Sequence, residues 1–167
     1  MTSGAKSAML MNIQLRKAKA TDISLVKKMF VENSWEYIPE TQKKLLDREK
    51  WNMNVIADYE NILKEENTEV FVAEDEHHKY VGHLIVGQIR GQITKLTFGY
   101  IYDIFVEEKF RGKGIGKLLL EKAEDYCRKN GQSRIALSVA ATNDSAIKLY
   151  SRTGYKPERI NMAKEII

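Results

Sequence analysis

The sequence has very little cysteine and no long hydrophobic run. A single cysteine, Cys127, excludes an intrachain disulfide and is typical of a reducing compartment, so we expect a cytoplasmic protein. No apolar stretch approaches the roughly 20 residues that cross a bilayer, so we expect no membrane association. The net charge of +4 is mild and no stripe of basic and aromatic residues stands out, which argues against nucleic-acid binding.

Length and composition indicate one globular domain. The chain has 167 residues, of which 43% are hydrophobic and 30% charged, as in ordinary globular proteins. The first residues lack the apolar core of a secretory signal. We therefore expect residues 1–11 to be a flexible leader and residues 12–167 to form the domain.

The spacing of apolar residues predicts an α+β domain on a mixed sheet. Alternating apolar residues and β-branched or aromatic runs mark strands, whereas repeats of three and four residues mark amphipathic helices. The expected strands are 12–18, 69–74, 80–89, 100–106 and 134–139, with one or two closing strands within 155–167. The expected helical regions follow Thr21 and Pro39 and include 55–63, 115–127 and 143–150, and Asn143 is expected to be the N-cap of the last of them.

The most informative stretch joins the strand 100–106 to a glycine-rich turn and a helix. Gly112, Gly114 and Gly116 lie in this turn, where a phosphate could approach the backbone and the free N–H groups of the helix start. The spacing does not fit the ATP/GTP loop, which needs Gly at position 111 and Ser or Thr at position 118. It does not fit the dinucleotide fingerprint either, because no small residue follows at the required position. A tight strand–helix turn without a ligand remains the alternative.

Two motifs identify the chain as a member of a known family. Arg111, Gly114 and Gly116 fit the pattern Arg/Gln-x-x-Gly-x-Gly/Ala, which resembles the acetyl-CoA-binding signature of the GNAT superfamily of N-acetyltransferases. A second block is similar to that family's Asn-x-x-Ala-x-x-Leu-Tyr-x-x-x-Gly-Phe/Tyr pattern. It matches at Asn143, Ala146, Leu149, Tyr150, Gly154 and Tyr155.

The resemblance implies a fold and a cofactor site. It implies a sheet of about six to seven strands flanked by helices, in which strands 100–106 and 134–139 splay apart and hold acetyl-CoA between them. Coenzyme A is the product that remains after the acetyl group is transferred. The pantetheine would pair with the backbone of Ile104, Phe105 and Val106. The remaining cofactor residues implied are Arg111, Gly112, Lys113, Gly114, Ile115, Gly116, Lys117 and Asn143.

Two side chains are candidates for moving protons. Tyr150 occupies the position where the family commonly places a tyrosine near the thioester sulfur, so we expect it to be the acid; the alternative is a packed core tyrosine. Asp103 is the best candidate for the base, although it could equally be a structural hydrogen-bond acceptor. Ser138 stands where one branch of the family has a glutamate, so a water relay without a dedicated base also remains open.

Other reactive side chains have simpler explanations. Cys127 lies on the apolar stripe of its helix, which favours a buried thiol over an acyl-enzyme nucleophile. His77 and His78 lie in a polar turn without a partner cluster, so we expect no metal site there. His83, within a strand, is expected to be a hydrogen-bonded core or groove residue rather than a base.

The acceptor is the least determined part of the prediction. Trp35, Glu36 and Tyr37 lie in the connection that usually lines the acceptor pocket and could surround a cation, although the aromatic pair could also just cover the core. We expect direct transfer to a primary amine of a small molecule such as a polyamine. A protein N-terminal or lysine acetyltransferase and a non-catalytic CoA-binding module remain alternatives, and a homodimer is left open.

Overall fold

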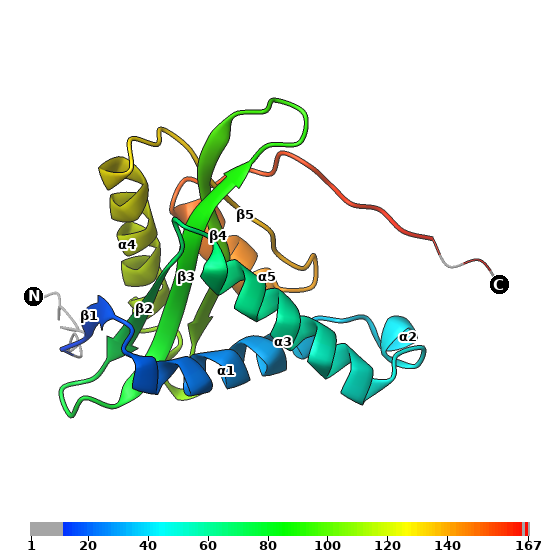
Figure 1. Ribbon diagram of the computed structural model, residues 1–167, viewed down its shortest axis with the longest axis horizontal. Helices are drawn as coiled ribbons and strands as arrows, with labels where there is room; N and C mark the ends of the chain where they lie inside the picture. The colour runs from blue at the N-terminus through cyan, green and yellow to red at the C-terminus, as the bar shows by residue number, and fades with distance from the viewer. Residues whose placement is uncertain (1–11, 165, 167) are drawn as a thin grey trace, which may run out of the picture.

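The protein is a mixed sheet packed between two layers of helices, as seen in a computed structural model that describes residues 12–164 and 166 (Figure 1). The expected leader, residues 1–11, lies outside the described residues. The strands are β1 (Gln14–Lys17), β2 (Glu69–Glu74), β3 (Tyr80–Arg90), β4 (Thr97–Val106) and β5 (Ile135–Leu137). The α-helices are α1 (Ile23–Glu36), α2 (Glu40–Lys43), α3 (Arg48–Lys64), α4 (Ile115–Lys129) and α5 (Asp144–Arg152), and short 3₁₀ turns are η1 (Ala20–Asp22) and η2 (Glu108–Phe110).

The strands follow one another across the sheet in the order β1-β2-β3-β4-β5. All neighbours are antiparallel except β4 and β5, which are parallel and are joined through α4. This arrangement confirms the predicted α+β class. The described residues contain five strands, fewer than the six to seven that we expected.

The prediction of closing strands after α5 was wrong for the described residues. Residues 155–164 form no strand. This segment contains the run Lys-Pro-Glu-Arg at 156–159, which has no apolar alternation, and Pro157 cannot donate to a ladder. Its apolar residues Ile160 and Met162 are 81% and 91% exposed, so no buried face holds the segment against β5.

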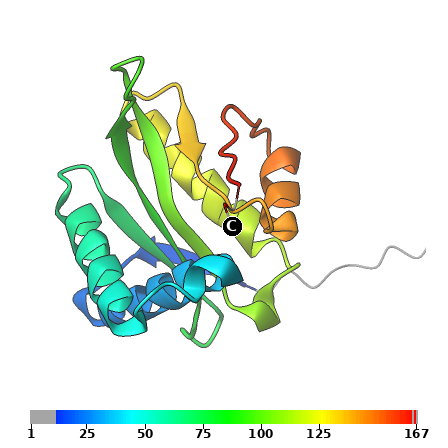
Figure 2. The same ribbon diagram turned by 90° about the vertical axis from the view of Figure 1, so that its right-hand side faces the viewer.

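Each face of the sheet packs on its own helices (Figure 2). On one face α4 contributes a fully buried apolar stripe that packs against β3 and β4; this core includes Leu84, Val86, Ile101, Leu119, Leu120 and Ala123. On the other face α1 and α3 pack together, and their core includes Val26, Phe30, Tyr59, Val72 and Ile85. None of the helices among the described residues is long and apolar enough to cross a membrane.

Two β-bulges change which face the side chains of β3 and β4 point to. Opposite Ala73 and Glu74 of β2, β3 carries one extra residue, Val81. Opposite Ile85 and Val86 of β3, β4 carries one extra residue, Tyr102. Because side chains alternate along a regular strand, each extra residue reverses the alternation beyond it. Ile101 therefore packs in the α4 core, whereas Asp103 can turn to the α1 side.

Candidate active site

A cavity opens where β4 and β5 separate. The two strands pair only over Gly99–Ile101 and Ile135–Leu137. Beyond this point β4 continues to Val106 with no partner strand on that side among the described residues, and the chain after β5 turns away into the loop before α5. The gap forms a cavity of about 610 Å³ lined by β4, the α4 start, the loop after β5, α5 and α1. The parallel pair thus splays as expected.

The start of α4 forms one wall of the cavity. Gly112 and Gly114 have φ of 74° and 84°, a left-handed conformation that favours glycine, and Gly114 is the N-cap. The first helical hydrogen bond runs from Leu118 N–H to Gly114 C=O at 3.1 Å, so the amides before it have no helical partner. A Cβ at Gly112 or Gly114 would meet no atom within 4 Å, so the space outside this turn is open.

Gly116, the second residue of α4, has a different role. A Cβ there would lie 2.8 Å from Leu149 Cδ2 of α5. Gly116 therefore lets α4 and α5 approach closely, and it lines the same cavity. The α5 helix is capped as predicted, because Asn143 Oδ1 accepts a hydrogen bond from Ala146 N–H at 3.1 Å.

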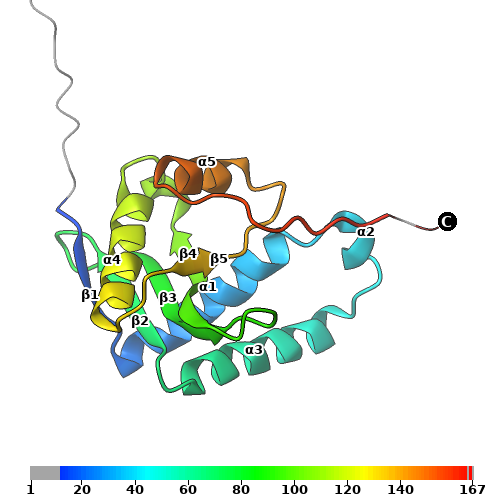
Figure 3. The same cartoon turned by 90° about the horizontal axis from the view of Figure 1, so that it is seen from above.

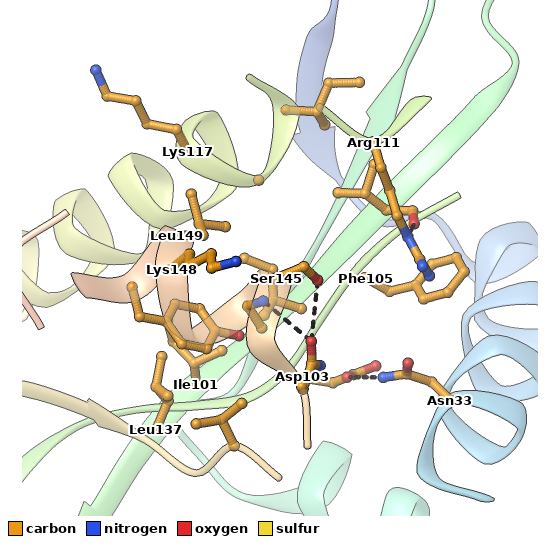
Figure 4. A pocket seen from close by; sticks show the side chains of 18 of the residues that line it. Asn33, Ile101, Asp103, Phe105, Arg111, Lys117, Leu137, Ser145, Lys148 and Leu149 are labelled. Carbon is orange, nitrogen blue, oxygen red and sulfur yellow. Dashed lines mark hydrogen bonds between the residues drawn. The ribbon is translucent and has the colours of Figure 1, made fainter. Parts of the chain in front are cut away.

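Several cationic residues line the cavity. Its lining includes the cationic residues Arg111, Lys117, Lys148 and Arg152, whereas Lys113 is not among the lining residues. Arg111 Nε donates to the Val106 carbonyl at 3.0 Å, which ties the turn back to the end of β4. In Figure 4 Lys148 turns toward the middle of the cavity, whereas Lys117 extends away from it.

Asp103 is the only acidic residue among the described residues that line the cavity. Its Oδ2 lies 2.7 Å from Nε2 of His83, and its Oδ1 accepts a hydrogen bond from Asn33 Nδ2 at 3.2 Å. Figure 4 shows Asn33 of α1 pointing at this carboxylate. The Asp103 side chain is 10% exposed and His83 is fully buried. The hydrogen-bonded His83 that we predicted is confirmed.

Tyr150 brings a second proton-carrying group to the cavity from α5. Its hydroxyl has no hydrogen-bond partner among the described residues, although the side chain is 9% exposed and lines the cavity. Burial, and then the negative charge of Asp103, raise the pKa of Tyr150 to about 12. The phenol therefore keeps its proton at neutral pH.

The predicted acceptor residues do not lie together in the cavity. Tyr37, at the C-terminal end of α1, lines it, but Trp35 and Glu36 do not. The Trp35 ring packs edge-on against Trp51 at 4.8 Å, and the Arg48 guanidinium lies 3.8 Å from the centre of the Trp35 ring. We had expected a cationic ligand beside these aromatic rings, but the cation found there is the guanidinium of Arg48.

Several lining residues were missed in the sequence. Ser145, Lys148 and Arg152 are spaced by three and four residues, so once α5 was predicted, its helical period could have placed these three on one face. Asn33 had no local signal, because its contact with Asp103 joins residues 70 positions apart.

Of the remaining reactive residues, Cys127, His77 and His78 lie away from the cavity, whereas Ser138 lines it. Cys127 is buried beneath Gly99, and burial raises the pKa of its thiol, so it is a core residue as predicted. His77 and His78 lie in the turn between β2 and β3, where no cluster of three or more metal-binding side chains exists among the described residues. Ser138 lines the cavity, and its Oγ accepts a hydrogen bond from the Tyr100 hydroxyl at 3.0 Å.

Comparison with known proteins agrees with this architecture. The chain is 38% identical over 68 residues to an uncharacterized N-acetyltransferase of Methanocaldococcus jannaschii and 39% identical over 67 residues to one of Bacillus subtilis. These matches cover 41% and 40% of this chain but only 30% and 43% of the two relatives.

Solved structures share the fold over nearly the whole chain. A putative acetyl transferase from Pyrococcus furiosus superposes with a TM-score of 0.78 at 29% identity, covering 93% of this chain and 100% of that protein. A predicted acetyltransferase from Clostridium acetobutylicum, solved with acetyl-CoA, superposes with a TM-score of 0.68 at 18% identity, covering 92% of this chain and 96% of that protein. The sequence model of the acetyltransferase (GNAT) family matches residues 28–155, and the chain belongs to this family.

Proposed function

We propose that the protein is an N-acetyltransferase that moves an acetyl group directly from acetyl-CoA to a primary amine. The observation that carries the proposal is one cavity with two different ends. A cationic turn with free amides lies at one end, and a carboxylate and a protonated phenol, Asp103 and Tyr150, lie deeper inside.

The residues of the cavity fit acetyl-CoA chemically. Its pyrophosphate needs N–H donors and positive charge, which the amides of Ile115–Lys117 and the side chains of Arg111 and Lys148 offer. Its pantetheine carries amides, and the unpaired edge of β4 from Tyr102 onward can bind them as an added strand. The Val106 carbonyl already accepts from Arg111, which leaves residues 102–105 for this pairing.

Bound acetyl-CoA would supply an activated acetyl thioester, and the protein's residues would handle the protons. Asp103 can accept a proton from the incoming ammonium, because each carboxylate oxygen keeps a free lone pair beside its existing hydrogen bond. Tyr150 holds a proton at its hydroxyl, with no competing acceptor among the described residues, and can give it to the departing sulfur. Burial of Cys127 supports direct transfer, and a stable acetyl group on that thiol would contradict it.

The charge of the site favours an acceptor with a single ammonium group. Asp103 is the only acidic lining residue among those described, and Glu40, at the start of α2, does not line the cavity and pairs with Lys43 at 2.8 Å. A multiply charged polyamine would leave its other ammonium groups unpaired. We therefore propose a small monoamine, with a peptide α-amine as the second candidate because its lower pKa, near 8, needs only a weak base.

A two-part experiment tests the proposal. Calorimetry measures acetyl-CoA binding, and thiol release is followed with spermidine, small monoamines and short peptides that have free α-amines. We expect binding, and the highest kcat/KM for an amine of single charge. Tight binding with no thiol release for any amine would favour a non-catalytic CoA-binding module. A kcat/KM for spermidine above that for all monoamines would refute the charge argument.

A further inference from the structure

A line of hydrogen bonds continues from Asp103 into the protein, away from the cavity. Asp103 Oδ2 lies 2.7 Å from His83 Nε2, and His83 Nδ1 lies 2.6 Å from the Tyr80 hydroxyl. Only Asp103 of these three lines the cavity. His83 is fully buried and its ring stacks on Phe105 with centres 5.7 Å apart and an angle of 25°. An imidazole with both nitrogens engaged and no route to solvent has its orientation fixed.

The two bulges are what bring these side chains together. Tyr80 and His83 are three residues apart, so a regular β3 would point them to opposite faces; the extra residue Val81 puts them on the same face. His83 is directly opposite Phe105 of β4, and Asp103 is the diagonal neighbour on that face. The extra residue Tyr102 allows Asp103 to be on this face while Ile101 stays in the α4 core.

The hydrogen-bond inventory places a proton on Nε2 of His83. An ionised Asp103 can only accept, so Nε2 must carry the proton of the Asp103 bond. Burial, and then the negative charge of Asp103 and Glu107, raise the pKa of Tyr80, so its hydroxyl stays protonated and can donate to Nδ1. A neutral His83 with its proton on Nε2 satisfies both bonds. Tyr80 thus holds the imidazole in the form that donates to Asp103.

We propose that Tyr80 and His83 are positioning residues that orient Asp103 as the proton acceptor of the transfer reaction. The proposal rests on the proposed function, since it assigns Asp103 the amine proton. Asn33 donates to Oδ1 from α1 and His83 donates to Oδ2 from β3, so the carboxylate is held between two elements. This differs from a Ser-His-Asp triad, because here the carboxylate contacts the cavity and the histidine stands behind it.

Kinetics of three variants test this role. His83→Phe keeps an aromatic ring on Phe105 but removes the donor to Asp103, and we expect kcat for the amine to fall roughly 10–10²-fold while the acetyl-CoA KM stays within about twofold. His83→Gln, whose amide N–H can still reach Asp103, should recover part of the loss. Tyr80→Phe should lower kcat less, because the ring of His83 remains.

Tyr59→Phe is the matched control for Tyr80→Phe. Tyr59 is buried on the same side of the sheet, but its hydroxyl donates to the Ile23 carbonyl at 3.4 Å and takes no part in the line. We expect wild-type kcat for Tyr59→Phe. Equal kcat values for Tyr80→Phe and Tyr59→Phe, or a kcat of His83→Phe within twofold of wild type, would overturn the proposal.

The tautomer of His83 gives a readout that does not depend on activity. Nitrogen-15 NMR of the imidazole should show a protonated, slowly exchanging Nε2 and an unprotonated Nδ1 at neutral pH in the wild type. A proton on Nδ1 would overturn the inference. This measurement also decides the matter if His83→Phe does not fold. If the wild type acetylated no amine, the proposed function would fail, whereas the tautomer would still report whether the hydrogen-bond line exists.

Discussion

Gly114→Glu is the substitution that tests the cofactor turn most directly. Gly114 has φ of 84°, and a Cβ there would project into open space at the N-terminus of α4. The backbone cost of a non-glycine residue in this conformation is about 1–2 kcal/mol. For a chain of this size that corresponds to a fall in Tm of roughly 2–8 °C, which leaves the protein folded.

The expected loss of acetyl-CoA binding free energy in Gly114→Glu is larger than its loss of folding stability. A glutamate at this position would occupy the space proposed for the pyrophosphate and oppose its charge. Each hydrogen bond to a charged group is worth about 1.5–3 kcal/mol, so losing one weakens binding roughly 10–150-fold. Because at least two amides precede Leu118 N–H in α4, we expect the Kd for acetyl-CoA to rise by at least about 10²-fold.

Gly131→Glu is the matched control. Gly131 follows α4 at its other end, with φ of 69° and no atom within 4 Å of a Cβ, and it does not line the cavity. The Gly131→Glu variant should lose about as much folding stability as Gly114→Glu but keep the wild-type affinity for acetyl-CoA. Calorimetry with acetyl-CoA and thermal unfolding of both variants give the comparison. Wild-type affinity in a folded Gly114→Glu variant, or equal losses in both, would refute the placement of the pyrophosphate.

Three further changes probe the site and the fold. Tyr150→Phe should lower kcat roughly 10–10³-fold with acetyl-CoA affinity nearly intact, and unchanged turnover would make Tyr150 a packing residue. Gly116→Ala should change the free energy of unfolding by less than about 1 kcal/mol, because the gain in helix propensity offsets the displacement of Leu149 Cδ2, the movable end of a side chain that the new Cβ would meet at 2.8 Å. Urea unfolding should show a more favourable effect of Gly116→Ala in a Leu149→Ala background, where that contact is absent. Arg16→Met should destabilise at pH 7, because Arg16 lowers the pKa of Asp22 through a 2.7 Å hydrogen bond. That contribution is present above the unfolded pKa of about 3.9 and is lost as pH falls through the lower folded value, so urea midpoints of the variant and the wild type should converge in acid.

Features that depend on local sequence were predicted well. The start of α4, the cap of α5 by Asn143 and the buried strands on either side follow from glycine, capping residues and apolar spacing within a short window. The splayed strands were predicted from the family motifs, and the binding of acetyl-CoA by the glycine turn before α4 stays a prediction. The edge of the sheet was less predictable, because a strand forms after Tyr155 only if that segment can pack its apolar side chains on a neighbouring surface. Ile160 is exposed and packs on no such surface among the described residues.

The surroundings of each candidate side chain could not be predicted, because they depend on contacts between distant residues. Trp35 was expected to face a ligand, yet its ring packs on Arg48, which begins another helix. Asp103 was identified as the base candidate, but its bonds to Asn33 and His83 come from two elements that the sequence does not place beside it. The residue types suggested which side chains could bind a cation or accept a proton. Which of these side chains are already engaged by other residues became visible only from contacts between distant parts of the chain.

The bulge at Tyr102 decides from which side each substrate must enter in the proposed reaction. In a regular β4, Asp103 would share the face of Ile101 and lie against α4, on the same side as Tyr150. The extra residue turns the carboxylate toward α1, where Asn33 contacts it, while Tyr150 approaches from α5 (Figure 3). Asp103 and Tyr150, the proposed proton acceptor and donor, therefore reach the cavity from opposite sides of the sheet. The amine is accordingly expected to enter past α1 and Tyr37, and the thioester from the α4–α5 side, so that the two meet without a covalent enzyme intermediate.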